Sequence, residues 1–389
     1  MLQIRRNEFA KKFLDFLKEE GFEINWGDIL TNVNGSLGRL HIAYAMKKKG
    51  IVKKVSDAFD KYLNPFKEKY ENQFEFNTID VIKLINNAGG PPPGSWEDWK
   101  TDDFLSQQRG FLKPLWDRKK SLKGKRILVW SEQGVGDTIN WSSCLSHLTS
   151  QADYCILECQ EKIVSLLARS FPNIEIRPED RSMDSKRDDF DFHLPMGSLY
   201  RHFIPHLSEN SNIDAYLVPD PVRVKFWRDR LGSLGKGPFI GLSWKSSMLS
   251  PYRLKHYPPI SEWSSVLSVP DVTFINLQYT DFAEDLIDIK NGLGVTVHNF
   301  DDLDQYNDVD DVAALCAALD MVVSTKVTPL IFSSGVGTPT KVASWRQSIW
   351  NSVLTNPVCS SAKMFNRDTW ESWDNVFKSI AEDILQLKN

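Results

Sequence analysis

Short apolar runs alternate with helical patterns between residues 125 and 344, and this alternation restricts the fold more than any other feature of the sequence. Continuous apolar strands separated by helices are typical of βαβ units, which build a parallel sheet covered on both faces. A long amphipathic stretch, PVRVKFWRDRLGSL, divides the runs into two sets, so the sequence predicts an α/β protein with two tandem Rossmann-like domains. The predicted strands are 125–131, 152–159, 173–178, 190–196, 238–246, 272–279, 295–300, 321–326 and 338–344.

The residues before these strands have a different pattern. Apolar residues recur there at a spacing of three to four, with glycines at plausible helix ends, which indicates a small helical module at 1–95. Three consecutive prolines close to its end exclude both a helix and a central strand. We expect the following organisation: linker 96–113, first domain 114–234, second domain 235–360, and a helix in 361–389 that packs back on the first domain.

Composition excludes several functional classes. The 389 residues carry 47 basic and 51 acidic side chains, a net charge of −4, which gives no general attraction to nucleic acid or anionic lipid. No apolar run approaches the roughly 18 residues of a membrane span, and the N-terminus lacks a secretory signal. We therefore expect a cytoplasmic protein without a nucleic-acid partner or integral membrane contact.

Cysteine and histidine patterns indicate neither a disulfide framework nor a metal site. The five cysteines are an odd number without paired spacing, and Cys155 and Cys159 lie in a predicted buried strand. The histidines form no cluster with the spacing of zinc ligands. The sequence therefore predicts no metal and no cofactor.

Two open α/β sheets bind ligands beyond the carboxyl ends of their strands, so the residues just after each strand are the candidates. The first strand is followed by SEQGVGDTINW, in which Gly134 and Gly136 permit a tight turn and close approach of the backbone to a ligand. Asp137 then begins a helix, where it either caps the free N–H groups or serves function. A dinucleotide fingerprint with Glu158 on the ribose is a further, weaker interpretation, because Ile139 stands at the third glycine position.

A longer stretch around this motif resembles a known family. Residues 114–141, PLWDRKKSLKGKRILVWSEQGVGDTINW, resemble the start of the glycosyltransferase domain found after tetratricopeptide repeats in many bacterial proteins. The resemblance continues through FDFHLPMGSLYRHF, IGLSWKSS, FINLQY and DVDDVAALCAALDMVVST, to about residue 380. Such domains are similar to lipopolysaccharide heptosyltransferases and, more distantly, to O-linked N-acetylglucosamine transferases. The resemblance thus implies a GT-B architecture and metal-independent, inverting transfer from a nucleotide sugar to a protein or glycan hydroxyl.

The resemblance also implies roles for single residues. Asp137 matches the acid that deprotonates the acceptor, and Lys245 and Ser246 match the position that meets the donor diphosphate. Gln278 and Asp311 match donor-side contacts. The alternatives are a solvated lysine at 245 and ordinary helix-capping or strand-end hydrogen bonds at 278 and 311. Residues 1–95 are the candidate module for recruiting the acceptor.

The chain departs from the family at VVSTKVTPLIFSSGVGTPTK. Lys326 replaces an acid there, and Ile331 replaces a histidine. Lys326 and Thr328 at a helix N-terminus could still hold phosphate or carboxylate. Arg253 and Lys255, in a loop over the predicted cleft, suit the same anionic groups. The competing interpretation is a catalytically degenerate protein that binds a nucleotide or glycan without transferring sugar.

Overall fold

The computed structural model describes residues 109–387 except Arg118, Gln133, Met183 and the segments 200–202, 204–214, 248–255, 346–358 and 368–371. These described residues belong to one compact unit, Arg109–Arg346 with Thr355–Asn389. The predicted helical module 1–95, most of the linker, Arg253 and Lys255 lie outside the described residues. No helix in the described part of the chain is long and apolar enough to cross a membrane.

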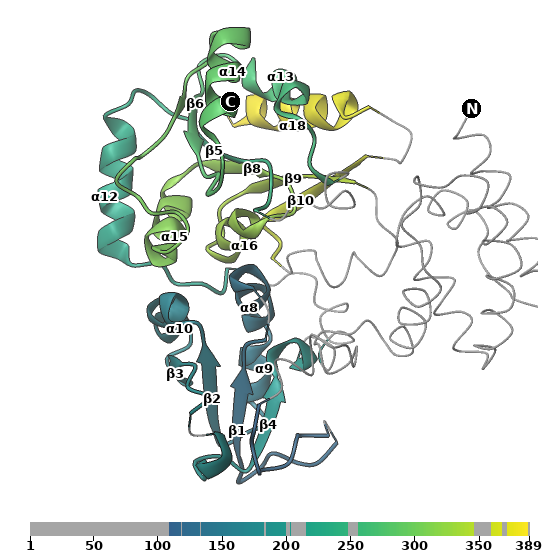
Figure 1. Ribbon diagram of the computed structural model, residues 1–389. Coiled ribbons are helices and arrows are strands. Elements are labelled where there is room, and N and C mark those ends of the chain that lie inside the picture. The colour runs from purple at the N-terminus through teal and green to yellow at the C-terminus, as the bar shows by residue number, and fades with distance from the viewer. Residues whose placement is uncertain are drawn as a thin grey trace, which may run out of the picture. The chain divides into compact units, whose positions relative to one another are not determined.

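The first half of the unit contains a parallel sheet with the strand order β3-β2-β1-β4 (Figure 1). Its strands are β1 (Arg126–Trp130), β2 (Tyr154–Cys159), β3 (Glu175–Pro178) and β4 (Phe192–Pro195). The helical segments between them are α8 (Val135–Ser142), α9 (Leu145–Thr149), η1 (Glu161–Ile163), α10 (Val164–Ser170) and η2 (Asp184–Lys186). Phe111, from the segment that precedes the sheet, packs against a buried cluster of Leu128, Ile156 and Phe190.

The second half contains a six-stranded parallel sheet with the order β10-β9-β8-β5-β6-β7. Its strands are β5 (Phe239–Ser243), β6 (Thr273–Asn276), β7 (Val297–His298), β8 (Met321–Ser324), β9 (Thr340–Trp345) and β10 (Ala362–Arg367). Its helical segments are α12 (Pro221–Gly232), η4 (Ile260–Trp263), α13 (Ser264–Leu267), α14 (Ala283–Leu293), α15 (Val309–Ala318), α16 (Thr328–Gly335) and α18 (Asp374–Gln386). The expected α/β class with two parallel sheets is thereby confirmed.

The order of the second sheet reverses between β5 and β8, which are neighbours although two strands, β6 and β7, lie between them in the chain. Strands β6 and β7 extend the sheet from one side of β5, whereas β9 and β10 extend it from β8. Such a reversal opens a crevice beyond the carboxyl ends of the two central strands. Ligand-binding residues of this half are therefore expected after Ser243 and after Ser324.

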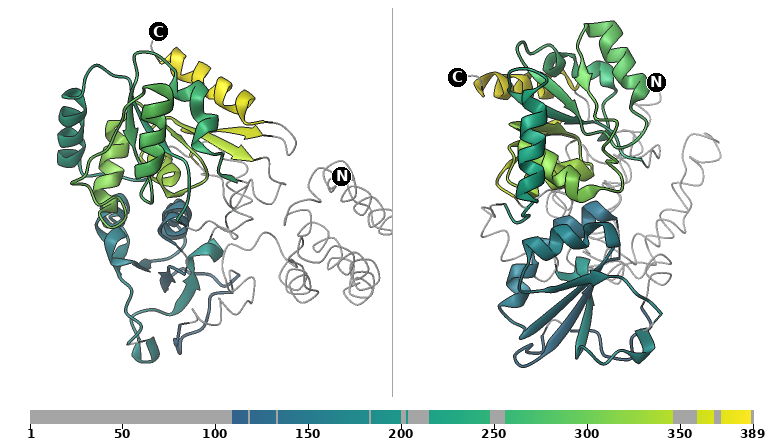
Figure 2. Two further views of the ribbon diagram at one scale, coloured as in Figure 1. Left: turned by 45° about the horizontal axis from the view of Figure 1, so that its top comes forward. Right: turned by 90° about the vertical axis from the view of Figure 1, so that its left-hand side faces the viewer.

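The described residues within 361–389 pack on the second sheet, whereas the expectation was a helix that returns to the first domain. Residues 362–367 form β10, an edge strand of the second sheet, and α18 lies over the same sheet, in yellow in Figure 2. The reason is the apolar stripe on α18, whose buried side chains join the core around β5 and β6; the stripe comprises Val376, Phe377, Ile380, Ala381 and Ile384. Two lysines, Lys341 of β9 and Lys363 of β10, also bind the Asp383 carboxylate.

Candidate functional site

The carboxyl edges of the two sheets meet at one close contact between helices. Gly136 is the second residue of α8, which follows β1, and Thr328 is the first residue of α16, which follows β8. A Cβ atom added to Gly136 would lie 3.0 Å from Thr328 Oγ1 and 3.6 Å from Thr328 Cα. The absence of a side chain at 136 therefore allows the two helices to approach each other.

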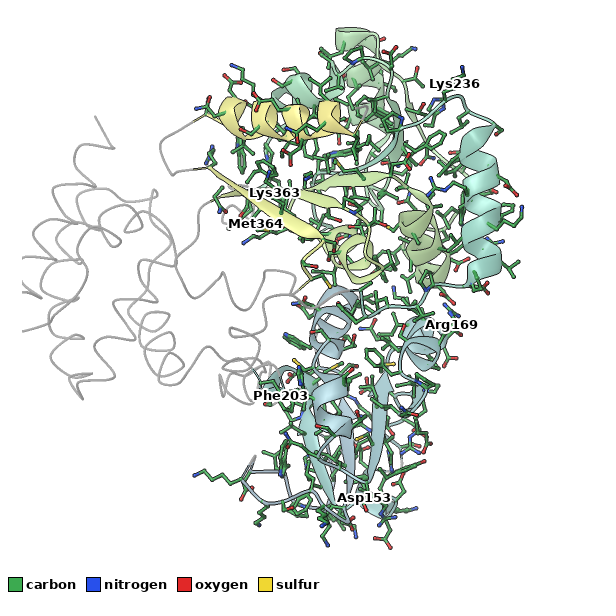
Figure 3. All side chains as sticks on the ribbon, turned by 180° about the vertical axis from the view of Figure 1, so that it is seen from behind. Asp153, Arg169, Phe203, Lys236, Lys363 and Met364 are labelled. Carbon is green, nitrogen blue, oxygen red and sulfur yellow. The ribbon has the colours of Figure 1, made fainter. Side chains whose placement is uncertain are left out.

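Hydrogen bonds around this contact join the two halves. The Tyr216 hydroxyl donates to Ile139 O of α8 at 3.0 Å, and the Tyr216 N–H donates to Gly335 O of α16 at 2.9 Å. Arg169 of α10 donates to Val218 O at 2.8 Å and pairs with Asp310 of α15. Figure 3 shows Arg169 on the side of α10 that faces the second sheet's helices. These bonds fix the spacing between the two carboxyl edges.

Asp137 lies in the first turn of α8, where the helix dipole favours a negative charge. Asp137 is exposed to solvent. The N-cap of this helix is Gly134. A Cβ atom at Gly134 would lie 3.4 Å from Asp137 Oδ2, so the glycine leaves room for this carboxylate. Asp137 is thus the third residue of the helix and not its N-cap, and its carboxylate lies at the carboxyl edge of the first sheet.

Gln278 shapes the loop that follows β5. Its buried side chain accepts hydrogen bonds from Trp244 N at 2.9 Å and Lys245 N at 3.0 Å, and it donates to Lys245 O at 2.7 Å. Strand-end hydrogen bonds, the alternative to a donor contact at this position, are therefore present, and the amide binds the backbone of Lys245. Ser246 follows in the same loop and is half-buried.

Lys245 is half-buried and its ammonium group has an acidic partner. Lys245 Nζ lies 2.6 Å from Asp285 Oδ2 of α14, and the same oxygen accepts a hydrogen bond from Trp244 Nε1 at 2.7 Å. A phosphate near β5 would therefore share this lysine with Asp285. The lysine is positioned by contacts and is not an ordinary solvated side chain.

Lys326 and Thr328 lie beyond the carboxyl end of β8. Lys326 is half-buried, and burial lowers the pKa of its ammonium group to about 8. Pro329 is the second residue of α16 and has no N–H, while the Leu330 N–H donates to Val327 O at 3.1 Å. An anion at this helix end would thus depend on Lys326 and Thr328 more than on a row of free amides.

Asp311 binds a different part of the molecule. Its buried carboxylate accepts hydrogen bonds from Arg223 Nε at 2.8 Å and Trp227 Nε1 at 2.6 Å, both on α12. The cap of α15 is Asp308, whose side chain accepts from Asp311 N at 3.2 Å. Asp311 therefore joins α12 to α15 and is not the helix cap.

Glu158 cannot serve the ribose of a dinucleotide. Its buried carboxylate accepts from Arg109 Nη2 at 2.8 Å and from Arg177 Nε at 3.2 Å, and it also pairs with Arg187. Three guanidinium groups occupy its oxygens, so the dinucleotide interpretation is wrong. This charge cluster was not predicted, although the alternation of acids and bases in RPEDRSMDSKRDD at 177–189 is a sequence signal for it.

The cysteines of β2 are core residues, as predicted. Cys155 and Cys159 are buried and free, and burial raises the pKa of their thiols to about 11 and about 12. They are therefore protonated near neutral pH. Within the described ranges, histidine, cysteine and acidic side chains form no group of three or more that could hold a metal ion.

A pocket of about 890 Å³ opens at the opposite, amino-terminal edge of the second sheet. Its lining includes Lys236, which Figure 3 labels, together with Asp271, Thr273 and Asp320. Asp320 is already bound by Arg228 at 3.0 Å and by Phe239 N at 2.8 Å. None of the predicted site residues lines this pocket, so we place the candidate site at the carboxyl edges.

Comparisons with known proteins give one relative and a group of similar structures. No family model matches the chain. The chain is 30% identical over 276 residues to Protein FlbA of Caulobacter vibrioides, and the match covers 67% of this chain and 46% of that protein. The chain thus spans about half the length of this curated relative.

Similar solved structures are glycosyltransferases of low sequence identity. One is a glycosyl transferase of family 9 from Veillonella parvula, 13% identical with a TM-score of 0.49, covering 67% of this chain and 95% of that one. Another is ADP-heptose lipopolysaccharide heptosyltransferase II of E. coli, also 13% identical with a TM-score of 0.49, covering 68% and 100%.

Gly136→Ala tests the approach of the two helices. Alanine favours a helix by up to about 1 kcal/mol over glycine, but here its methyl group would meet Thr328 Oγ1. We expect Gly136→Ala to lower the free energy of unfolding by up to about 1 kcal/mol, and Gly136→Ala with Thr328→Ala to recover that loss. Urea unfolding of the two single variants and the double variant measures this coupling.

Gly292→Ala is the matched control. Gly292 lies in α14, and nothing lies within 4 Å of a Cβ atom added there. This substitution should raise the free energy of unfolding by roughly 0.5 to 1 kcal/mol. An equal stabilisation by Gly136→Ala would contradict the close contact.

Proposed function

We propose that this protein is a glycosyltransferase that moves a sugar from a nucleotide-sugar donor to a hydroxyl group of a protein or glycan. The observation that carries the proposal is the close contact between Gly136 and Thr328, which joins the carboxyl edges of two parallel sheets. An exposed carboxylate, Asp137, lies on one side, and two lysines, Lys245 and Lys326, lie beyond strands of the other sheet. A GT-B-like reaction needs a base on the acceptor side and cations on the donor side.

The proposed reaction is a single displacement at the anomeric carbon. The Asp137 carboxylate takes the proton of the acceptor hydroxyl while the hydroxyl oxygen forms the new glycosidic bond to the anomeric carbon. The bond between the anomeric carbon and the diphosphate breaks, and the nucleoside diphosphate leaves with the electron pair. Attack from the face opposite the leaving group inverts the anomeric configuration. Lys326 and Lys245 would offset the negative charge that develops on the diphosphate, which is the task of a metal ion in other transferases.

The other candidates have supporting roles in this proposal. Gln278 holds the backbone of Lys245, so we assign it the positioning of that loop. Ser246 and Thr328 supply hydroxyl groups for phosphate oxygens, and Asp311 fixes the start of α15 through α12. We propose residues 1–95 as the module that recruits the acceptor, and the cytoplasm as the compartment.

Turnover of nucleotide sugars tests the proposal. The full chain is incubated with UDP-, GDP-, CMP- and ADP-linked sugars, and release of the nucleotide and of the sugar is followed by mass spectrometry. Slow release of both from one donor, accelerated by an acceptor, is the expected result. Failure to turn over any donor would contradict the proposed transferase.

A second candidate is a degenerate protein that binds nucleotides or glycans without catalysis. Lys326 and Ile331 favour it, because an acid and a histidine stand at these positions in the family that the sequence resembles. Calorimetry in parallel with the turnover assay distinguishes the two candidates. Micromolar binding of a nucleotide sugar without release of its sugar would support the binder and exclude the transferase.

The pH dependence of binding tests Lys326. Burial lowers the pKa of this side chain to about 8, so its positive charge is lost as the pH rises through that value. We expect the affinity for a nucleoside diphosphate to fall roughly tenfold between pH 7 and pH 9, since about 1.4 kcal/mol of charge pairing is lost. Isothermal titration calorimetry at constant ionic strength measures the affinity at both pH values.

Arginine provides the matched control at this position. Lys326→Arg keeps its charge throughout this range and should make the affinity independent of pH, whereas Lys326→Met should be weak at both pH values. If the affinity of Lys326→Met falls between pH 7 and pH 9 as much as that of the wild type, the titrating group is not Lys326.

A further inference from the structure

Two tyrosine rings follow β6 and β7, the two strands that extend the second sheet from β5. Tyr279 follows β6, and Tyr306 precedes α15 after β7. Their ring centroids are 6.3 Å apart and the ring planes are inclined by 35°. Tyr306 is 55% exposed, whereas Tyr279 is half-buried. A large aromatic ring so exposed offers an apolar face to a ligand.

The position of Tyr306 is fixed by its neighbours. Asp304 accepts hydrogen bonds from the N–H groups of Tyr306 and Asn307, each at 3.0 Å, which forms a tight turn. Lys162, from the first half, donates to Tyr306 O at 2.7 Å, and its ammonium group lies 4.1 Å from the centroid of the tyrosine ring. The ring is therefore held in place with a cation near its face, and little conformational entropy is lost when a ligand stacks on it.

An unsatisfied polar atom lies beside this turn. Gln305 donates through Nε2 to Asn276 O, at the end of β6, at 3.1 Å. Its Oε1 atom is buried and has no hydrogen-bond partner among the described residues. A buried acceptor without a partner is costly, which points to a donor group that a ligand supplies.

We propose that Tyr279 and Tyr306 form a stacking site for the nucleobase of the donor, with Gln305 Oε1 accepting a hydrogen bond from an N–H group of the base. This inference rests on the proposed function. The sheet order β8-β5-β6-β7 supports it, because one to three inter-strand spacings of roughly 5 Å separate the strands that precede the tyrosines from the strands that precede the lysines. An extended nucleoside diphosphate can cover this distance, with its phosphates at the lysines and its flat base at the tyrosines.

Calorimetry with the full chain tests the stacking site. The probes are ADP, GDP, UDP and CDP, with inorganic pyrophosphate as the probe that has no base. Stacking of a base on an aromatic side chain contributes enough that Tyr306→Leu should weaken the tightest-binding nucleotide roughly 5- to 150-fold. Pyrophosphate binding should stay unchanged, and Tyr306→Phe, which keeps the ring, should stay within about threefold of the wild type.

Tyr154→Leu is the matched control, since Tyr154 is 46% exposed at the start of β2. It should leave nucleotide affinity unchanged. If Tyr306→Leu binds the nucleotides as tightly as the wild type while sugar turnover continues, the stacking site is wrong and the transferase stands. If the wild type binds no nucleotide at millimolar concentration, the stacking site and the proposed function both fail.

Discussion

Asp137→Asn should lower the rate of sugar transfer by about 10² to 10⁴, the usual contribution of a general base. The asparagine keeps the size of the side chain but cannot accept the proton of the acceptor. Because Gly134 is the N-cap of α8, the cost in stability is limited to the interaction of the charge with the helix dipole, roughly 0.3 to 1 kcal/mol. Steady-state kinetics and thermal unfolding of the same preparation measure both effects.

Glu284→Gln is the control for this experiment. Glu284 is an exposed acid in the first turn of α14, so like Asp137 it lies near a helix N-terminus, but in the other half of the unit. It should change stability by a similar small amount and leave transfer unchanged. The affinity of Asp137→Asn for a nucleotide should stay within about twofold of the wild type, a change of less than 1 kcal/mol in binding free energy. The reason is that the proposed donor contacts follow strands of the second sheet, whereas Asp137 follows β1. Near-normal turnover by Asp137→Asn would end the catalytic assignment.

Arg109→Met should lower the free energy of unfolding by about 3 to 5 kcal/mol, the largest effect on stability that we expect. The Arg109 guanidinium is fully buried and binds the buried carboxylates of Glu158 and Asp184. Methionine fills a similar volume but leaves Asp184 without its cation. Urea denaturation monitored by tryptophan fluorescence gives the difference.

An exposed ion pair supplies the comparison. Lys113 pairs with Asp188, whose side chain is 84% exposed. Lys113→Met should therefore cost less than about 1 kcal/mol, because water screens such pairs. Equal losses in Lys113→Met and Arg109→Met would show that the buried cluster contributes no more than a surface pair.

The positions of most strands could be predicted because continuous apolar runs are a local signal. Residues 126–130 and 239–243 are buried almost throughout, as a parallel sheet requires. Strand β10 was missed, because Lys363 and Asn366 are exposed and interrupt its pattern. It forms by pairing with β9, a tertiary contact that the local sequence does not encode. The packing of α18 depends in the same way on which apolar surface remains uncovered.

The candidate site was predictable in its location and not in its contacts. Topology alone places the residues after β1, β5 and β8 at the carboxyl edges of the sheets. The partner of Lys245 is Asp285, 40 residues away, and the partners of Asp311 lie on α12. Such pairs depend on how helices pack, so the sequence could not distinguish a donor contact from a structural hydrogen bond.

Hydrogen exchange with and without a saturating nucleoside diphosphate tests the central claim most directly, because it locates the bound ligand in the intact chain. We expect slower exchange in 244–247 and 324–330, at the carboxyl ends of β5 and β8, and no change in 236–238 and 271–273 at the amino-terminal pocket. Protection confined to the amino-terminal pocket, or no protection at all, would contradict a nucleotide-sugar site between the carboxyl edges of the two sheets.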